Sequence, residues 1–221
     1  MMERIPEPEL MDSEAQVRAY AEADFDEPHG ACVADFCHRF PNEPAAGRIL
    51  DLGCGPADIT CRLARVRNGT TLTAVDAGPN MLAAADQRIR DEGLAHRIEL
   101  VEGRLPGARL PAASFDAVVS NSLLHHMAEP HALWQTIAHA ARPGAPVYVM
   151  DLMRPSSREA AARLVEEHAA GEPEILQQDF YNSLLAAWRP GEVRQQLAET
   201  GLDHLSVEAL SDRHLLVWGR R

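Results

Sequence analysis

A glycine-containing turn between a predicted strand and a predicted helix is the part of this sequence best suited to chemistry. The apolar run Ile49–Leu52 leads into Gly53-Cys-Gly55, and a helical pattern follows at about residues 57–66. Two glycines allow the chain to turn tightly and allow its backbone to approach a ligand closely. The arrangement therefore predicts a ligand site at the end of this strand.

Three acidic residues narrow the class of ligand. Asp58 stands where a dinucleotide-binding fingerprint requires a third glycine, and Asp51 lies two residues before the first glycine. A carboxylate at Asp51 suits an ammonium group better than a pyrophosphate. Asp76 ends the next predicted strand, 21 residues after Gly55, where an acid can accept hydrogen bonds from ribose hydroxyls. These three acidic residues favour a ligand that contains a nucleoside and a positively charged group but no phosphates. S-adenosylmethionine fits that description.

Four segments, in chain order, resemble motifs of the class I S-adenosylmethionine-dependent methyltransferases. They are Asp51–Ala57, Ala74–Leu82, Phe115–His126 and Arg142–Gly144. The resemblance covers about residues 45–151. It implies an α/β fold, a doubly wound, mostly parallel seven-stranded sheet in the order 3-2-1-4-5-7-6 with helices on both faces. It also implies S-adenosylmethionine as cofactor and methyl transfer by in-line displacement to a small-molecule acceptor.

The resemblance and the position of the flanking segments assign candidate binding residues. We expect cofactor contacts from the strand ends and the turns after them: Asp51, Gly53, Gly55, Asp76, Ala77, Met81, Gly103, Arg104, Leu105, Asn121 and Ser122. We expect acceptor contacts from segments before the first strand and after the fifth: Tyr20, Phe25, His29, Arg154, Tyr181 and Asn182. Arg104 departs from the family, because many members have an acid after Gly103 that accepts a hydrogen bond from adenine.

His125 and His126 follow the fourth predicted strand, where the resemblance places the methyl group. A neutral imidazole there can act as a general base for a hydroxyl or amine acceptor. The alternative is that a histidine only packs or hydrogen-bonds within the loop. Neighbouring residues on a turn point in different directions, so we expect at most one of the two to be catalytic, and we favour His125.

The cysteines predict neither a disulfide framework nor a metal site. His29, Cys32, Cys37 and His38 do not place four ligands on one helix face, and Cys37 belongs to an apolar stripe. We therefore predict no metal. Cys54 and the nearby Cys61 are expected to pack in the core.

Composition excludes several functions. The 221 residues include 33 acidic and 21 basic residues, so the net charge is 21 − 33 = −12, which disfavours nucleic acid as the main partner. All basic residues are arginines, so a Schiff-base lysine and a P-loop lysine are excluded. No signal peptide is visible and no apolar run reaches about 18 residues, so we expect a soluble cytoplasmic protein, monomeric or homodimeric, that does not engage membranes.

Strands alternate with helices from residue 48 onwards, as in a doubly wound domain. The predicted strands are Ile49–Leu52, Thr71–Asp76, Ile98–Glu102, Phe115–Ser120, Pro146–Asp151, Leu205–Leu210 and His214–Gly219, the last two forming an antiparallel hairpin. The predicted helices span 13–23, a segment capped by Asp26, 57–66, 79–91, 130–141, 156–169, 179–188 and 191–200. We interpret 1–221 as one methyltransferase domain with an N-terminal helical cap (1–44), a cofactor-binding core (45–151), a helical insertion or lid (152–190) and a C-terminal helix and hairpin (191–221).

Two other functions stay open at this stage. A methyltransferase acting on RNA or protein is disfavoured by the net charge and by Ser120-Asn121-Ser122-Leu123, which lacks the Asn/Asp-Pro-Pro-Tyr/Phe pattern. A regulatory module that binds S-adenosylmethionine without chemistry would keep the same motifs, and only measured methyl transfer separates it from an enzyme.

Overall fold

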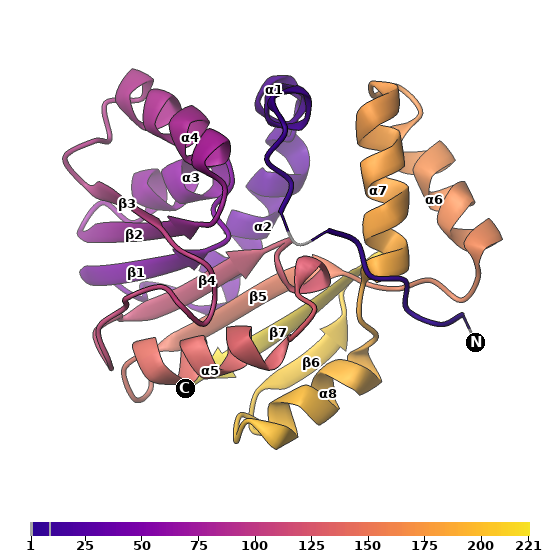
Figure 1. Cartoon of the computed structure of the whole chain (residues 1–221). Helices are drawn as coiled ribbons and strands as arrows, with labels where there is room; N and C mark the ends of the chain where they lie inside the picture. Colours follow the sequence, from indigo (N-terminus) through magenta and orange to yellow (C-terminus); the bar gives the residue numbers. More distant parts are fainter. Residues whose placement is uncertain (1, 9) are drawn as a thin grey trace.

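A seven-stranded sheet forms the centre of the computed structural model, which describes residues 2–8 and 10–221 (Figure 1). Its strand order is β3-β2-β1-β4-β5-β7-β6, as the resemblance implied. The strands are β1 (Gly47–Leu52), β2 (Thr70–Asp76), β3 (Ile98–Glu102), β4 (Ala117–Asn121), β5 (Pro146–Leu152), β6 (Ser206–Ala209) and β7 (His214–Arg220). Neighbouring strands are parallel from β3 to β5, whereas β7 is antiparallel to both β5 and β6, which confirms the terminal hairpin.

Helices cover both faces of the sheet. They are α1 (Glu14–Glu22), α2 (Asp26–Arg39), α3 (Asp58–Val66), α4 (Pro79–Asp91), the 3-10 helix η1 (Leu124–His126), α5 (His131–Ala140), α6 (Arg158–Ala169), α7 (Glu174–Ala186) and α8 (Pro190–Glu199). Helices α2, α3 and α4 pack on one face, and α5, α8 and η1 pack on the other. Helices α6 and α7 pack together beyond the end of β5. None of the helices in the described part of the chain is both long and apolar enough to cross a bilayer.

Alternate residues of β1 point to opposite faces of the sheet, and both faces are buried. Leu50 and Leu52 belong to the core under α5 and α8, together with Trp134. Ile49 belongs to the core under α2, α3 and α4, together with Phe36. Burial on both faces explains why Ile49, Leu50 and Leu52 are all apolar, although they alternate in direction. It also sets the register of β1, and therefore the point at which the chain leaves the sheet.

The parallel strands end at one edge of the sheet, and the direction of winding reverses between β1 and β4. The chain moves outwards from β1 through β2 to β3, then crosses to β4 and β5 on the other side of β1. In open α/β sheets a crevice forms at such a switch point. Because Leu52 pairs with Ser120, the turns after β1 and β4 lie side by side there.

The N-terminal segment is docked against this edge. This N-terminal arm contains no helix or strand at residues 2–8 or 10–13. Arg4 donates through Nε to the carbonyl of Ala186 at 2.6 Å and through Nη2 to the carbonyl of His125 at 2.9 Å. The Arg4 guanidinium also stacks on Trp188, 4.1 Å from the ring centre. In Figure 1 the segment passes between the sheet edge and α7.

Most element boundaries differ from the predicted ones by one or two residues, and three differences have a clear local cause or consequence. Helix α7 begins at Glu174, five residues earlier than predicted, directly after a proline that caps it. Helix α2 begins at Asp26, so its N-cap is Phe25 and not Asp26 as predicted. Strand β4 begins at Ala117, because Phe115 forms only an isolated bridge with the segment before β5.

Candidate cofactor and acceptor site

The turn after β1 leaves open space beside its backbone. Gly53 and Gly55 have φ angles of +76° and +52°, in the left-handed region that glycine tolerates. A Cβ on Gly53 would lie 2.9 Å from the side chain of Leu123, whereas a Cβ on Gly55 would have no neighbour within 4 Å among the described residues. Gly53 therefore serves close packing against the β4 loop, and Gly55 borders space that a ligand can occupy.

The carboxylate of Asp76 joins the two turns that border this space. Its Oδ2 accepts a hydrogen bond from the backbone N–H of Gly55 at 2.8 Å, and its Oδ1 accepts one from Gly78 at 2.8 Å. Each carboxylate oxygen can accept a further hydrogen bond. Burial raises the pKa of Asp76 even though these backbone bonds oppose the rise.

Asp51 is a buried acid at the floor of the same space. Its Oδ2 accepts a hydrogen bond from the hydroxyl of Thr60 at 2.5 Å. Burial raises the pKa of Asp51 to about 6, with a further rise from Asp76 and a partial offset from Thr60. At neutral pH this carboxyl is ionised, so a cation reaching it would meet a buried negative charge.

Asp58, the residue that replaced a third glycine, is held by three partners. Its carboxylate contacts His29 at 2.7 Å, Arg62 at 2.8 Å and Arg88 at 3.1 Å. Despite burial, the hydrogen bonds from His29 and Arg62 hold the pKa of Asp58 at about 2. Asp58 is therefore ionised, and its charge is balanced by the arginines that hold it beside the turn.

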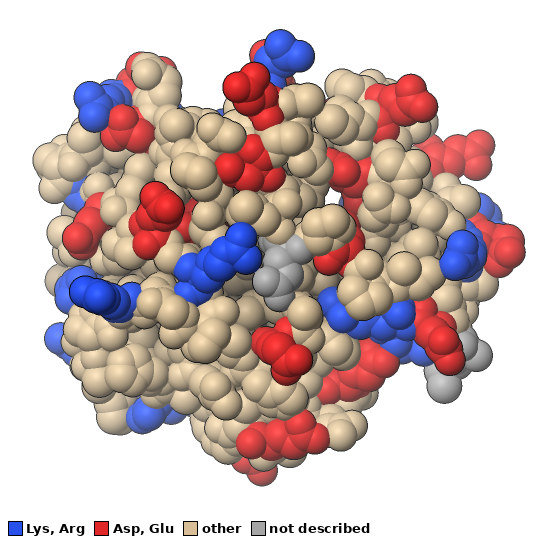
Figure 2. All heavy atoms as spheres, viewed as in Figure 1, with Lys and Arg blue, Asp and Glu red and all other residues tan. Residues whose placement is uncertain are grey.

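One cavity of about 1480 Å³ contains these polar groups. The eleven residues expected to bind the cofactor all line it: Asp51, Gly53, Gly55, Asp76, Ala77, Met81, Gly103, Arg104, Leu105, Asn121 and Ser122. Figure 2 shows an opening between α1 and α7, and residues of both these elements line the cavity. The structure thus brings together strand ends that are up to about seventy residues apart in sequence.

Three of the six residues expected to contact the acceptor line the same cavity. The rings of Tyr20 and Phe25 stack with their centres 5.9 Å apart, and those of Phe25 and His29 are 5.0 Å apart. This stack comes from α1, the turn after it and α2. It forms an aromatic wall beside the glycine turn, because His29 also contacts Asp58.

The other three are not among the cavity-lining residues. Arg154 is buried and donates to the carbonyl of Ala187 at 2.9 Å and to Glu192 at 2.5 Å. Tyr181 packs against the α6–α7 core, and Asn182 accepts a hydrogen bond from Gln178 along α7. A different face of α7 lines the cavity, with Leu176, Phe180 and Ser183 at i, i+4 and i+7.

His125 is almost fully buried in η1 and is oriented by a carboxylate. Its Nδ1 lies 2.6 Å from Oδ1 of Asp151, and Oδ2 of Asp151 accepts the backbone N–H of Leu124 at 2.6 Å. Burial opposes protonation, but the carboxylates of Asp151 and Glu7 outweigh it, and the pKa of His125 is raised above its ordinary value. Asp151, which lies near the end of β5 and orients His125, was not identified as a site residue from the sequence.

His126 faces the N-terminal arm. Its Nδ1 lies 3.2 Å from Oε1 of Glu7, while Nε2 of His125 lies 3.6 Å from the same oxygen. Burial and the neighbouring His125 hold the pKa of His126 well below its ordinary value. Sequence reasoning missed Glu7, because nothing in the spacing of an irregular arm says which of its acids turns inwards.

Charge on the surface agrees with the composition. On the face shown in Figure 2, arginines are scattered among aspartates and glutamates and form no continuous basic patch. This face therefore shows no basic surface of the kind that binds a phosphate backbone.

Sequence comparisons support a common family. Residues 49–146 match the family described as methyltransferase domain. The ubiquinone biosynthesis O-methyltransferase of Xanthomonas axonopodis pv. citri is 32% identical over 130 residues, which cover 58% of this chain and 52% of that relative. The chain thus spans about half the length of that relative. The uncharacterized methyltransferase Rv0089 of Mycobacterium tuberculosis is 30% identical over 149 residues, which cover 67% of this chain and 73% of that relative.

Solved structures share the fold at low sequence identity. A SAM-dependent methyltransferase from Aquifex aeolicus is 17% identical, with a TM-score of 0.62 over 95% of this chain and 94% of its own. Phosphoethanolamine N-methyltransferase 2 of Haemonchus contortus, solved with phosphomonomethylethanolamine and S-adenosylhomocysteine, is 20% identical, with a TM-score of 0.68 over 90% of this chain and 44% of its own. Motifs, sheet order and sequence relatives agree, and the chain belongs to the class I S-adenosylmethionine-dependent methyltransferases.

Proposed function

We propose that this chain transfers the methyl group of S-adenosylmethionine to a small-molecule acceptor. The observation that carries the proposal is one cavity that joins two chemically different regions. The ends of β1 and β2, with Asp51, Gly55 and Asp76, form the polar region, and Tyr20 and Phe180 line the aromatic one. A cofactor and an acceptor held in these two regions meet inside the cavity.

The residues of the polar region fit the chemistry of that cofactor. Asp76 has acceptor capacity left for ribose hydroxyls, Asp51 offers negative charge to an ammonium, and Gly55 leaves space beside its backbone. The cofactor supplies an electrophilic methyl carbon on a sulfonium when it is bound. The protein has to hold the acceptor in line with the bond that breaks and to exclude water.

For an acceptor that arrives protonated, we propose His125 as the group that takes the proton. Asp151 accepts a hydrogen bond from Nδ1 of His125, which favours the tautomer with the lone pair on Nε2 of that ring. An imidazole held in this way is an oriented general base. His126, whose pKa is lowered, is the alternative at the same wall of the cavity.

A small molecule is the acceptor class that the surroundings favour. Helices α1 and α2 on one side and α6 and α7 on the other supply lining residues, so the acceptor region is walled by elements outside the core of the fold. The acidic surface disfavours RNA. The name of the Xanthomonas relative, an O-methyltransferase of ubiquinone biosynthesis, supports the same class of acceptor.

The test supplies the purified chain with S-adenosylmethionine and, separately, with the low-molecular-weight, RNA and protein fractions of a cell extract. We expect S-adenosylhomocysteine to form with the low-molecular-weight fraction, and to form more slowly with an Asp76→Ala variant at limiting S-adenosylmethionine. Formation only with RNA or protein overturns the acceptor class. Formation with none of the fractions, by a chain that still binds S-adenosylhomocysteine, overturns methyl transfer and favours a binding module.

A further inference from the structure

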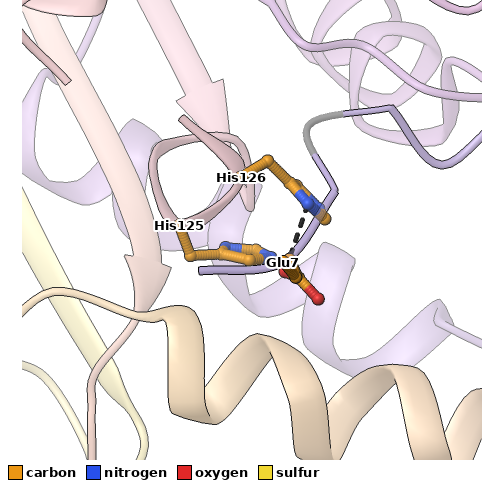
Figure 3. Close-up of side chains that lie close together, drawn as sticks. All are labelled: Glu7, His125 and His126. Atoms are coloured by element: carbon orange, nitrogen blue, oxygen red, sulfur yellow. Dashed lines mark ion pairs between the residues drawn. The ribbon is translucent and has the colours of Figure 1, made fainter. Parts of the chain in front are cut away.

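Three metal-ligating atoms meet where the N-terminal arm crosses η1. Oε1 of Glu7 lies 3.2 Å from Nδ1 of His126 and 3.6 Å from Nε2 of His125, and all three atoms lie within 4.8 Å of one another. Figure 3 shows the three side chains converging, Glu7 from the arm and the two imidazoles from η1. The side chain of Glu7 is 8% exposed, that of His126 14% and that of His125 3%, so the cluster is shielded from bulk water.

The remaining polar atoms of these side chains are already held by partners. Nδ1 of His125 is bound to Asp151 at 2.6 Å, which leaves Nε2 as the nitrogen that faces Glu7. The hydroxyl of Ser183 donates to Oε2 of Glu7 at 3.3 Å, which leaves Oε1 facing the imidazoles. The His126 ring hydrogen-bonds to the backbone of Pro8. Such partners orient the ligands in metal sites, where a carboxylate behind a histidine is the usual arrangement.

Two of the three converging atoms have no hydrogen-bond partner among the described residues. Oε1 of Glu7 and Nδ1 of His126 are buried and unsatisfied. An unsatisfied buried polar atom is costly and usually marks an ordered water, an ion or a functional group. Here an oxygen lone pair faces nitrogen lone pairs, and a cation placed between them would satisfy all three atoms.

We propose that Glu7, His125 and His126 form a binding site for a divalent transition metal ion of the zinc class. With metal–ligand bonds of about 2.0–2.2 Å, two ligands of a tetrahedral ion lie about 3.3–3.6 Å apart, close to the 3.2 and 3.6 Å that separate Oε1 of Glu7 from the two imidazole nitrogens. Two imidazoles and one carboxylate suit zinc and its neighbours, whereas calcium and magnesium prefer all-oxygen ligand sets. This site was not predicted from the sequence, because Glu7 belongs to no motif.

The proposed metal site lies at the wall of the cavity. Both imidazoles line the cavity, and three protein ligands leave a coordination position free for water or for an oxygen of a ligand. A metal-bound hydroxyl loses its proton more readily, so the ion would do by Lewis acidity what a free His125 would do as a base. Metal binding itself does not depend on the proposed methyl transfer and can be measured without cofactor.

The experiment titrates tag-free apoprotein with Zn²⁺ alone by calorimetry and reads Co²⁺ binding by visible absorption. We expect one equivalent of Zn²⁺ and a Co²⁺ spectrum typical of nitrogen and oxygen ligands. Glu7→Gln and His126→Ala should each weaken Zn²⁺ binding at least about 10- to 100-fold. Thermal unfolding of each variant shows whether it is folded, and the two variants remove ligands from different segments.

The exposed cluster Glu167, His168 and Asp212 provides the matched control. His168→Ala removes its imidazole, and a double Cys32→Ser, Cys37→Ser variant removes the thiols of α2. Both should keep the equivalent of Zn²⁺ with affinity within about threefold. The proposal is overturned if the wild type binds no stoichiometric Zn²⁺, if Glu7→Gln and His126→Ala bind it as tightly as the wild type does, or if the equivalent disappears in either control.

Discussion

The carboxylate of Asp76 accepts a hydrogen bond from the backbone N–H of Gly55 at 2.8 Å, across 21 residues of sequence. The contact ties the end of β2 to the glycine turn after β1, so the group proposed to bind ribose also holds the turn that borders the ligand space. Parallel pairing of β1 with β2 places the two segments next to each other, since Leu52 pairs with Val75.

Removing this carboxylate should weaken cofactor binding. Asp76→Ala loses the acceptors proposed for ribose and leaves the N–H of Gly55 without its partner. We expect the affinity for S-adenosylhomocysteine to fall by about 1–3 kcal/mol, measured by calorimetry. Asp86→Ala, an exposed position on α4 paired with Arg90, should leave the affinity unchanged. Equal affinities in the wild type and Asp76→Ala would exclude the ribose role.

Cofactor binding should weaken in acid because of Asp51. The free protein holds the pKa of Asp51 at about 6. An ammonium beside the carboxylate favours the ionised form, so bound protein has the lower pKa and binding releases a proton when the pH is below 6. We expect S-adenosylhomocysteine affinity to be constant above about pH 7 and to fall about tenfold towards pH 5.

The groups facing Asp51 define the control for this pH profile. They are the Thr60 hydroxyl, the Asp76 carboxylate and the Cys54 thiol, whose pKa is raised far enough by burial to keep it neutral. Asp51→Asn keeps the shape and removes the charge. The affinity of Asp51→Asn for S-adenosylhomocysteine should be lower than that of the wild type at pH 7.5, and it should depend much less on pH. A profile in Asp51→Asn as steep as in the wild type would assign the titration to Asp76 instead.

The proposed base gives a kinetic prediction. Once an acceptor is found, His125→Ala should lower kcat by about 10²–10⁴-fold, the usual contribution of general acid–base catalysis. Affinity for S-adenosylhomocysteine should stay within about threefold, because a group that acts on the acceptor need not touch the cofactor. His131→Ala, whose ring pairs with Glu199 at the surface, serves as the control and should keep full activity. Full activity in His125→Ala would leave alignment of the acceptor as the main catalytic device.

The docked arm should depend on Arg4. Arg4→Ala removes hydrogen bonds to the carbonyls of Ala186, His125 and Met127. Loss of about 1–3 kcal/mol of charge-assisted bonding should loosen the arm around Ile5, while Glu7 keeps its contacts with Ser183 and His126. Hydrogen exchange should show faster exchange at Ile5, whose N–H donates to Leu185, and unchanged protection in β1. Equal protection of Ile5 in both proteins would mean that the arm is held by other contacts.

Much of the fold and the cofactor half of the site could be predicted from the sequence. The apolar strands are buried on both faces and end in turns that contain glycine or acidic residues. The sequence pattern around Asp51, Gly53 and Asp76 therefore indicates where these residues lie in the fold. All three line the cavity, and their contacts with the cofactor stay a prediction.

The residues around the region proposed for the acceptor could not be predicted, because long-range packing decides which side chains reach it. Tyr181 and Asn182 were expected at the cavity, but the face of α7 that lines it carries Phe180 instead. Arg154 was expected to bind an acceptor, and its partners Ala187 and Glu192 come from segments more than thirty residues away. Glu7 reaches the cluster only because long-range contacts dock an irregular arm.

A crystal structure with S-adenosylhomocysteine tests the central claim most directly. We predict the ligand in the cavity, with its ribose hydroxyls on Asp76, its amino group near Asp51 and its sulfur directed towards the region lined by Tyr20 and Phe180. The space beyond the sulfur would then define the acceptor. A ligand bound elsewhere, or a cavity that stays free of ligand at saturating S-adenosylhomocysteine, would contradict the account.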